Sequence, residues 1–274
     1  PAPSTRPAGG ELMEVAPSRC DWDGTVKFAL GHGVQVAANG LLVFESVSPD
    51  RSWTALAPGD RWRGLEPRCV AHQLGEREIR ARFAAEGEAA LVVRVDEATA
   101  TMSIDATTRL PEPVYSHLNH AFQATLTGND LWITAAPCPE QPWQPLSREG
   151  PGDFAYIDAD GRFVLARTSS EEKGPFEERC RGTAPQGPVE LWVHAGDRLA
   201  GRILLHDWAT QADRSPSPTA GWGVSANAIE VWRASPTSLH LSASLSVTSI
   251  GRGWHAVGHA AGTYRSRVEL VALP

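Results

Sequence analysis

Residues 114–126, VYSHLNHAFQATL, combine the spacing of a β-strand with a dense set of polar side chains. With the two-residue period of a strand, one face carries Leu118, His120, Phe122, Ala124 and Leu126. The other face carries His117, Asn119, Ala121, Gln123 and Thr125. The second face therefore presents imidazole, amide and hydroxyl groups, which match the hydroxyls of a sugar. We predict that this strand forms a wall of a polar cleft, where Asn119 and Gln123 bind the substrate.

Most other periodic segments show the same alternation. In residues 239–247, five apolar side chains alternate with His240 and hydroxyl-bearing residues. Further strands are expected at residues 25–30, 41–47, 78–84, 91–95, 101–106, 131–135, 163–167, 189–193, 202–206, 229–233 and 264–273. No amphipathic helix exceeds about three turns. The pattern predicts an all-β fold, a large antiparallel β-sandwich with little helix.

The chain has 274 residues, which is long enough for one large β domain. Residues 1–20 begin PAPSTRPAGG and are expected to be a flexible lead-in, while residues 21–274 are expected to form a single β-sandwich domain. The formal net charge of −7 excludes nucleic acid as a partner, and no apolar run approaches the length of a membrane span. The oligomeric state is left open.

The four cysteines, Cys20, Cys69, Cys138 and Cys180, are widely and irregularly spaced. No Cys-x-x-Cys pair is present, so a structural zinc site is not expected. Two disulfides would form if the protein were exported, and we favour free thiols in a cytoplasmic protein instead.

Two segments break the strand pattern and are expected to be long loops, residues 137–151 and 168–188. Trp143 in the first loop and Trp222 in a later glycine-rich segment are candidates for stacking on a sugar ring. His206 and Trp208, at the end of an apolar strand, are further substrate-binding candidates.

Residues 251–267, GRGWHAVGHAAGTYRSR, place His255 and His259 four positions apart. Four glycines in the segment disfavour a continuous helix, and no third ligand is evident, so no metal is predicted. The strand that follows places Arg265, Arg267 and Glu269 on one face. The two arginines either clamp a carboxylate such as that of a uronic acid or form a solvated face with ion pairs.

Several motifs are absent from the sequence. It contains no Gly-x-Ser-x-Gly elbow, phosphate-binding glycine loop or dinucleotide fingerprint. We therefore expect no cofactor and no serine nucleophile.

The run Asn119-His120-Ala121-Phe122 resembles the Asn-His-x-x-Phe segment of aldose 1-epimerases, the galactose mutarotase family, with the aromatic residue one position early. The resemblance implies a β-supersandwich with the sugar bound across a concave sheet. It also implies that His120 protonates the ring oxygen and that a later glutamate, Glu230 or Glu269 by position, accepts the proton of the anomeric hydroxyl. Gly31-His32-Gly33 matches only in part an earlier His-Gly-Gly of that family.

A second resemblance is to β-sandwich polysaccharide lyases, which use Tyr or His for proton transfer and Asn, Gln or Arg to neutralise a uronate. It would assign these roles to His117, Asn119, His120, Tyr264 and Arg267. The sequence is also compatible with a non-catalytic sugar-binding module that uses Trp143, Trp208 and Trp222, and with a lipocalin-like barrel for an apolar metabolite.

The leading hypothesis is a cofactor-independent carbohydrate enzyme of the mutarotase or epimerase type, acting on a small-molecule or oligosaccharide substrate. Its expected catalytic residues are His117, His120, Glu230 and Tyr264. Its expected substrate-binding residues are Asn119, Gln123, Trp143, His206, Trp208, Trp222, Arg265 and Arg267.

Overall fold

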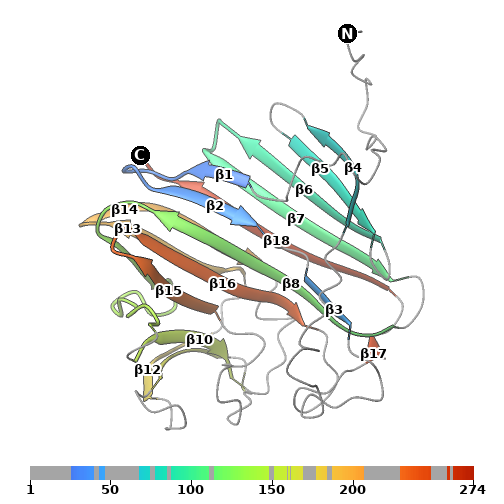
Figure 1. Cartoon of the computed structure of the whole chain (residues 1–274). Helices are drawn as coiled ribbons and strands as arrows, with labels where there is room; N and C mark the ends of the chain where they lie inside the picture. The colour runs from blue at the N-terminus through green and yellow to red at the C-terminus, as the bar shows by residue number, and fades with distance from the viewer. Residues whose placement is uncertain are drawn as a thin grey trace.

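β-Strands make up the regular secondary structure of the computed structural model (Figure 1). The structure describes residues 26–39, 43–46, 68–74, 78–84, 88–110, 114–147, 151–158, 160, 162–168, 177–183, 187–206, 229–247, 258–259 and 262–274. None of these residues is helical, and the strands form two large antiparallel sheets, so the predicted all-β sandwich is confirmed. Within the described residues, no helix is long and apolar enough to cross a membrane.

The first sheet has ten strands in the order β1-β2-β8-β16-β15-β10-β11-β12, and β3 and β17 also pair with β8. Its strands are β1 (Val26–Ala29), β2 (Gln35–Asn39), β3 (Val43–Ser46), β8 (Val114–Thr127), β10 (Asp153–Ile157), β11 (Phe163–Arg167), β12 (Glu177–Gly182), β15 (Ile229–Ser235), β16 (Ser238–Val247) and β17 (Gly258–His259). The strand β8 is central, because four other strands pair along its length.

The second sheet has eight strands in the order β4-β5-β6-β7-β18-β14-β13-β9. Its strands are β4 (Arg68–Leu74), β5 (Glu78–Ala84), β6 (Glu88–Asp96), β7 (Thr101–Leu110), β9 (Leu131–Ala135), β13 (Val189–Ala195), β14 (Arg198–His206) and β18 (Gly262–Ala272). Consecutive strands β4 to β7 form a meander, and β18 joins it to the remaining three strands.

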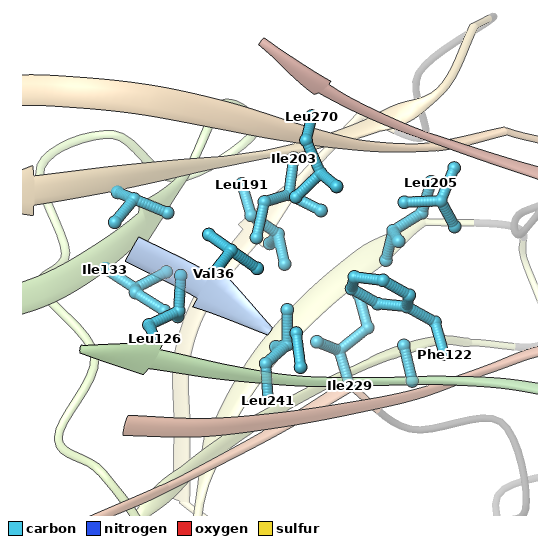
Figure 2. Packing of buried hydrophobic residues seen from close by; sticks show 14 of the residues in the cluster. Val36, Phe122, Leu126, Ile133, Leu191, Ile203, Leu205, Ile229, Leu241 and Leu270 are labelled. Atoms are coloured by element: carbon cyan, nitrogen blue, oxygen red, sulfur yellow. The ribbon is translucent and has the colours of Figure 1, made fainter. Parts of the chain in front are cut away.

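The core lies between the two sheets, which bury alternate side chains against each other (Figure 2). The ten-stranded sheet contributes Val36, Phe122, Leu126, Ile229 and Leu241, each at most 1% exposed. The eight-stranded sheet contributes Ile133, Leu191, Ile203, Leu205 and Leu270, with the same limit on exposure. Burial of each such side chain stabilises the fold by about 1.5–3 kcal/mol. The single-domain boundary at residue 21 stays a prediction, because residues 1–25 lie outside the described residues.

The predicted loop at residues 168–188 is wrong in part, because it contains the strand β12. The side chains of β12 are half-buried or exposed, which is typical of an edge strand. Such a strand lacks the apolar alternation that identified the predicted strands, so its sequence EERCRG is indistinguishable from that of a polar loop.

Residues 136–147, which we call the bridge, connect the two sheets at one side of the sandwich. The bridge follows β9 and ends beside β15, where the Leu146 N–H donates to the Val231 carbonyl at 2.7 Å and the Leu146 carbonyl accepts from the Arg233 N–H at 3.1 Å. Between these ends, the N–H of Trp143 donates to the Ile133 carbonyl at 2.9 Å. On this edge β15 pairs with β10 at Ile229 and Glu230, and the bridge pairs with it further along, at Trp232.

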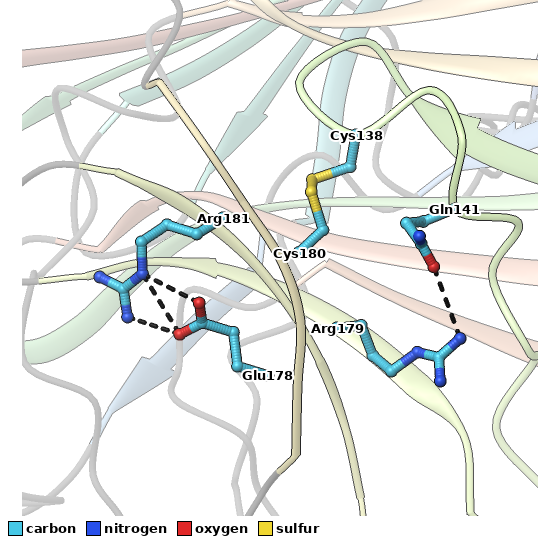
Figure 3. Close-up of a disulfide and its surroundings, with 6 residues drawn as sticks. All are labelled: Cys138, Gln141, Glu178, Arg179, Cys180 and Arg181. Carbon is cyan, nitrogen blue, oxygen red and sulfur yellow. Dashed lines mark hydrogen bonds and ion pairs between the residues drawn. A yellow bond between two sulfur atoms is a disulfide. The ribbon is translucent and has the colours of Figure 1, made fainter.

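A disulfide between Cys138 and Cys180 fastens the bridge to β12 (Figure 3). The prediction of free thiols is wrong for these two cysteines. They are 42 positions apart in the sequence, but the bridge brings their Cα atoms to 6.2 Å, within the range of a disulfide. A second contact, from Arg179 Nη2 to Gln141 Oε1 at 3.5 Å, joins the same two segments. Cys20 and the side chain of Cys69 lie outside the described residues.

Replacing both Cys138 and Cys180 by alanine should lower the free energy of unfolding by about 3–4 kcal/mol, because the cross-link restricts the unfolded chain. Equilibrium denaturation of the double variant against the unmodified protein, both without reductant, measures the change. A loss below about 1 kcal/mol would contradict the structural role of this cross-link.

Candidate functional site

A polar surface covers the outer side of β8, β16 and β15, away from the core. On these strands Phe122, Leu241 and Val231 point into the core and are fully buried. The side chains that alternate with the buried ones are half-buried, and we call them the polar face: Gln123, Thr125, Glu230, Trp232, His240 and Ser242. This surface supplies amide, hydroxyl, imidazole, indole and carboxyl groups.

The strand register arranges the polar face in two rows. In one row Ser242 lies opposite both Gln123 and Glu230. In the other, His240 lies opposite both Thr125 and Trp232. Because neighbouring strands are about 4.8 Å apart, each row spans about 10 Å and could contact a single sugar ring through several of its hydroxyls.

Glu230 is the carboxyl group of the polar face. Burial raises its pKa, and a hydrogen bond from Trp232 Nε1 to Glu230 Oε2 at 3.1 Å opposes this rise without cancelling it. Among the described residues, no arginine or lysine forms an ion pair with Glu230. A carboxyl group that is held by a neutral donor and has a raised pKa is suited to exchanging protons.

A charged surface occupies the outer side of the eight-stranded sheet. Its central group is Glu269, which lies 2.7 Å from His206 Nε2 and 2.5 Å from Arg267 Nη2. Arg267 also lies 3.6 Å from Asp105, which is itself paired with Arg94 at 3.0 Å. Burial raises the pKa of Glu269, but the hydrogen bonds from Arg267 and His206 and their charges outweigh it, so the pKa is lowered overall.

This charged surface agrees with one of the two expectations for Arg265, Arg267 and Glu269. The three residues share a face, since the intervening Ser266 and Val268 are buried. Arg267 already has two carboxylate partners and Arg265 is exposed. The arrangement is that of a solvated face with ion pairs.

The core separates the predicted site residues into two groups. Gln123 and Glu230 lie on the polar face of one sheet, whereas His206, Arg265 and Arg267 lie on the outer face of the other sheet. Tyr264 is paired with Thr108 in the eight-stranded sheet, and its side chain lies outside the described residues. The residues predicted for a lyase are therefore divided between two sheets.

The backbone of β8 continues past Gln123 to the three residues that first suggested a cleft. His120 is paired with Ser246, Asn119 with Val43 and Val247, and His117 with Glu45. The side chains of His117, Asn119 and His120 lie outside the described residues. The irregularity in this register falls on β16, between Ser244 and Ser246, so consecutive residues of β8 stay paired from Thr127 to Asn119.

Of the tryptophans predicted to stack on a sugar, Trp143 is the one whose side chain the structure describes. Trp143 is 3% exposed and belongs to the core, so it offers no open indole face. Its position in a proline-rich segment suggested a surface loop, but the bridge turns its side chain inward. Trp208, Trp222 and His255 lie outside the described residues.

Two other histidine motifs lie away from the polar face. His259 is in β17 and pairs with Val114, and its side chain is not described. No group of three metal-binding side chains occurs in the described part of the chain. Gly31-His32-Gly33 forms the turn between β1 and β2, where His32 and Gly33 have φ of 54° and 78° and are exposed.

Sequence reasoning missed Trp232 and His240 as site residues. Both alternate with buried residues on strands that were predicted, so their outward direction could have been inferred. The pairing of β15 with β16, and of β16 with β8, was not available from alternation alone. That pairing is what places His240 beside Glu230 and Gln123, whereas Trp232 lies two residues after Glu230 in the same strand.

No family model matches the chain, and no curated protein matches it in sequence. The solved structures that are similar to it include the following two. A candidate aldose 1-epimerase from Escherichia coli K12 has 9% identity and a TM-score of 0.42, and the match covers 90% of this chain and 99% of that one. A galactose mutarotase-related enzyme from Lactobacillus acidophilus has 7% identity and a TM-score of 0.39, covering 91% and 98%. At these identities and TM-scores, neither structure assigns a family or a catalytic residue to this chain.

Glu230→Gln and Glu269→Gln should change stability with opposite pH dependence. The folded-state pKa of Glu230 is raised, so Glu230→Gln should gain stability relative to the unmodified protein as pH rises from about 4.3, the pKa of an unfolded glutamate, up to the raised pKa of the folded state. The pKa of Glu269 is lowered, so Glu269→Gln should lose stability relative to the unmodified protein as pH rises from the acidic range to about 4.3, the pKa of an unfolded glutamate, and the loss should stay constant above it. Urea denaturation at several pH values measures both trends, and equal trends would contradict the assigned environments.

Proposed function

We propose that the polar face binds an aldose and that Glu230 acts as the base in a mutarotase or epimerase reaction at the anomeric carbon. The observation that carries the proposal is the state of Glu230. It is a half-buried carboxyl with a raised pKa, it is held by an indole, and a hydroxyl and an amide lie in the same row.

The proposed reaction moves only protons and one ring bond. Glu230 accepts the proton of the anomeric hydroxyl while an acid protonates the ring oxygen, and the bond from the anomeric carbon to that oxygen breaks. Rotation of the free aldehyde and reversal of these steps give the other anomer. No cofactor is required by this chemistry.

The pKa of Glu230 supports this role. A general base works best when its pKa lies near the working pH, and an ordinary carboxyl is too acidic for that. Burial shifts Glu230 in the required direction, while Trp232 keeps its ionised form accessible. Glu269 has its pKa shifted the other way, which favours Glu230 between the two glutamates that the resemblance allowed.

His120 and His117 stay proposals for the acid. Along β8 they are three and six residues from Gln123, which at about 3.4 Å a residue corresponds to about 10 Å and about 20 Å. By the alternation along β8, position 120 falls on the side of the buried Phe122, whereas position 117 falls on the side of Gln123, so His117 suits a substrate on the polar face better than the nearer His120 does. His117 and Asn119 suit a longer substrate that extends along β8.

A neutral sugar fits the polar face better than an acidic one, because its described side chains include no arginine or lysine. This weakens the lyase hypothesis, which needs a cation at the uronate. A sugar-binding module without activity remains the second candidate. Trp232, which is half-buried beside Glu230, supports it by offering a stacking surface in place of the buried Trp143.

The Cys138–Cys180 disulfide supports an oxidising compartment for the protein, in place of the predicted cytoplasmic one. Disulfides persist outside the reducing cytosol, and the bridge is held by this bond.

The proposal predicts that Glu230→Gln lowers kcat/KM for anomer exchange by at least about 100-fold, because the general base is lost. Exchange between the anomers of galactose and glucose can be followed by NMR magnetisation transfer. Glu190→Gln is the matched control, since Glu190 also receives an indole hydrogen bond, but on the other sheet. If the unmodified protein binds sugar saturably but exchanges the anomers no faster than buffer does, the binding module is favoured. Undiminished exchange by Glu230→Gln would contradict the role of this carboxyl.

A further inference from the structure

Two β-hairpins of this protein contain the same arrangement of a glutamate and a tryptophan. In β15, Trp232 Nε1 donates to Glu230 Oε2 at 3.1 Å, and in β13, Trp192 Nε1 donates to Glu190 Oε1 at 2.8 Å. In both strands the tryptophan follows the glutamate by two residues, so both side chains point to the same outer face. The two hairpins lie in different sheets.

The residue opposite the tryptophan differs between the hairpins. In β14, Arg202 lies opposite Trp192, and its Nη1 reaches the diagonal Glu190 Oε1 at 3.1 Å. In β16, His240 occupies the corresponding position opposite Trp232. The basic residue has the same position relative to the glutamate in both hairpins. Glu190 lies opposite Leu204, two residues after Arg202, and Glu230 lies opposite Ser242, two residues after His240.

We propose that His240 is the acid that works with Glu230, and that the indole of Trp232 holds the Glu230 carboxyl group in position. The arginine at this register position in the other hairpin, Arg202, reaches the diagonal glutamate, so the position is directed towards the carboxyl group. His240 and Glu230 occupy diagonal positions on neighbouring strands, which are about 7–8 Å apart. His240 is therefore closer to Glu230 than positions 117 and 120 of β8, which carry the predicted histidines. The inference rests on the proposed function of Glu230.

Because one hairpin has arginine and the other histidine at this position, the two basic–acidic pairs differ in chemistry. A guanidinium does not give up its proton, so Arg202 and Glu190 form a permanent ion pair. An imidazole gives and takes a proton near neutral pH. In the proposed reaction the His240 N–H passes its proton to the ring oxygen as Glu230 takes one from the anomeric hydroxyl. Reversal of the two transfers closes the ring and restores both side chains.

The surroundings of His240 contain few competing charges. Its direct neighbours are Thr125 on β8 and Trp232 on β15, and its diagonal neighbours are Gln123, Thr127 and Glu230. Of these, Glu230 is the ionisable group. Its carboxylate therefore provides the main local charge that the imidazole meets on these two strands.

His240→Asn should lower kcat/KM for anomer exchange by about 100-fold or more at neutral pH and should remove the fall in rate at high pH that reports loss of the acid's proton. Arg202→Gln, at the corresponding position of the other hairpin, should leave exchange within about twofold. His240→Gln provides a second variant if His240→Asn does not fold, as judged by circular dichroism.

A measurement without turnover tests the pairing itself. In ¹H–¹⁵N spectra of imidazole groups, the His240 resonances should move in Glu230→Gln and stay in place in Glu190→Gln. If Glu230→Gln abolishes exchange while His240→Asn retains it with its high-pH fall intact, the inference is overturned and the function of Glu230 stands. His117→Ala and His120→Ala would then identify the acid. If Glu230→Gln retains full exchange, the proposed function itself fails.

Discussion

The two-residue period of the strands, imposed by burial between two sheets, is the constraint on which the other features depend. Each strand of the ten-stranded sheet turns one set of side chains into a shared core, and Phe122, Leu241 and Ile229 are fully buried there. The alternate residues must then face outward. A shift of one residue would exchange the two sets, so the core fixes the composition of the polar face as firmly as it fixes the fold.

The two outer surfaces of the sandwich differ in how they satisfy their carboxyl groups. On the eight-stranded sheet, Glu269 and Glu190 each have a basic partner, with distances of 2.5 Å to Arg267 and 3.1 Å to Arg202. On the polar face, Glu230 has an indole donor and a raised pKa. An ion pair stabilises the charged form, while a half-buried carboxyl held by a neutral donor keeps both protonation states within reach. This contrast within one chain is the basis for assigning chemistry to one face and solvation to the other.

Local alternation predicted most of the strands, because burial of one face leaves a direct trace in the sequence. The bounds predicted for the strands at 78–84, 131–135 and 163–167 match β5, β9 and β11. It did not predict β2, β4, β10 or β17. It failed for β12, an edge strand without an apolar face, and for Trp143, whose burial depends on the path of the bridge. The Cys138–Cys180 pair was missed for the same reason, since a long-range approach leaves no local pattern. The site shows the same division, because Gln123 and Glu230 were named from the sequence, while the place of His240 beside Glu230 required the pairing of β15 with β16.

The central claim is that the polar face, and not the charged surface of the other sheet, binds the sugar. Trp232 and Trp192 are matched reporters, because each donates to a glutamate two residues before it on opposite outer surfaces. The most direct measurement follows their indole ¹H–¹⁵N resonances, assigned with Trp232→Phe and Trp192→Phe, as galactose is added to the full chain. If the polar face binds the sugar, the Trp232 resonance should shift saturably while the Trp192 resonance stays unchanged. A shift of Trp192 alone, or no shift of Trp232 at saturating sugar, would contradict it.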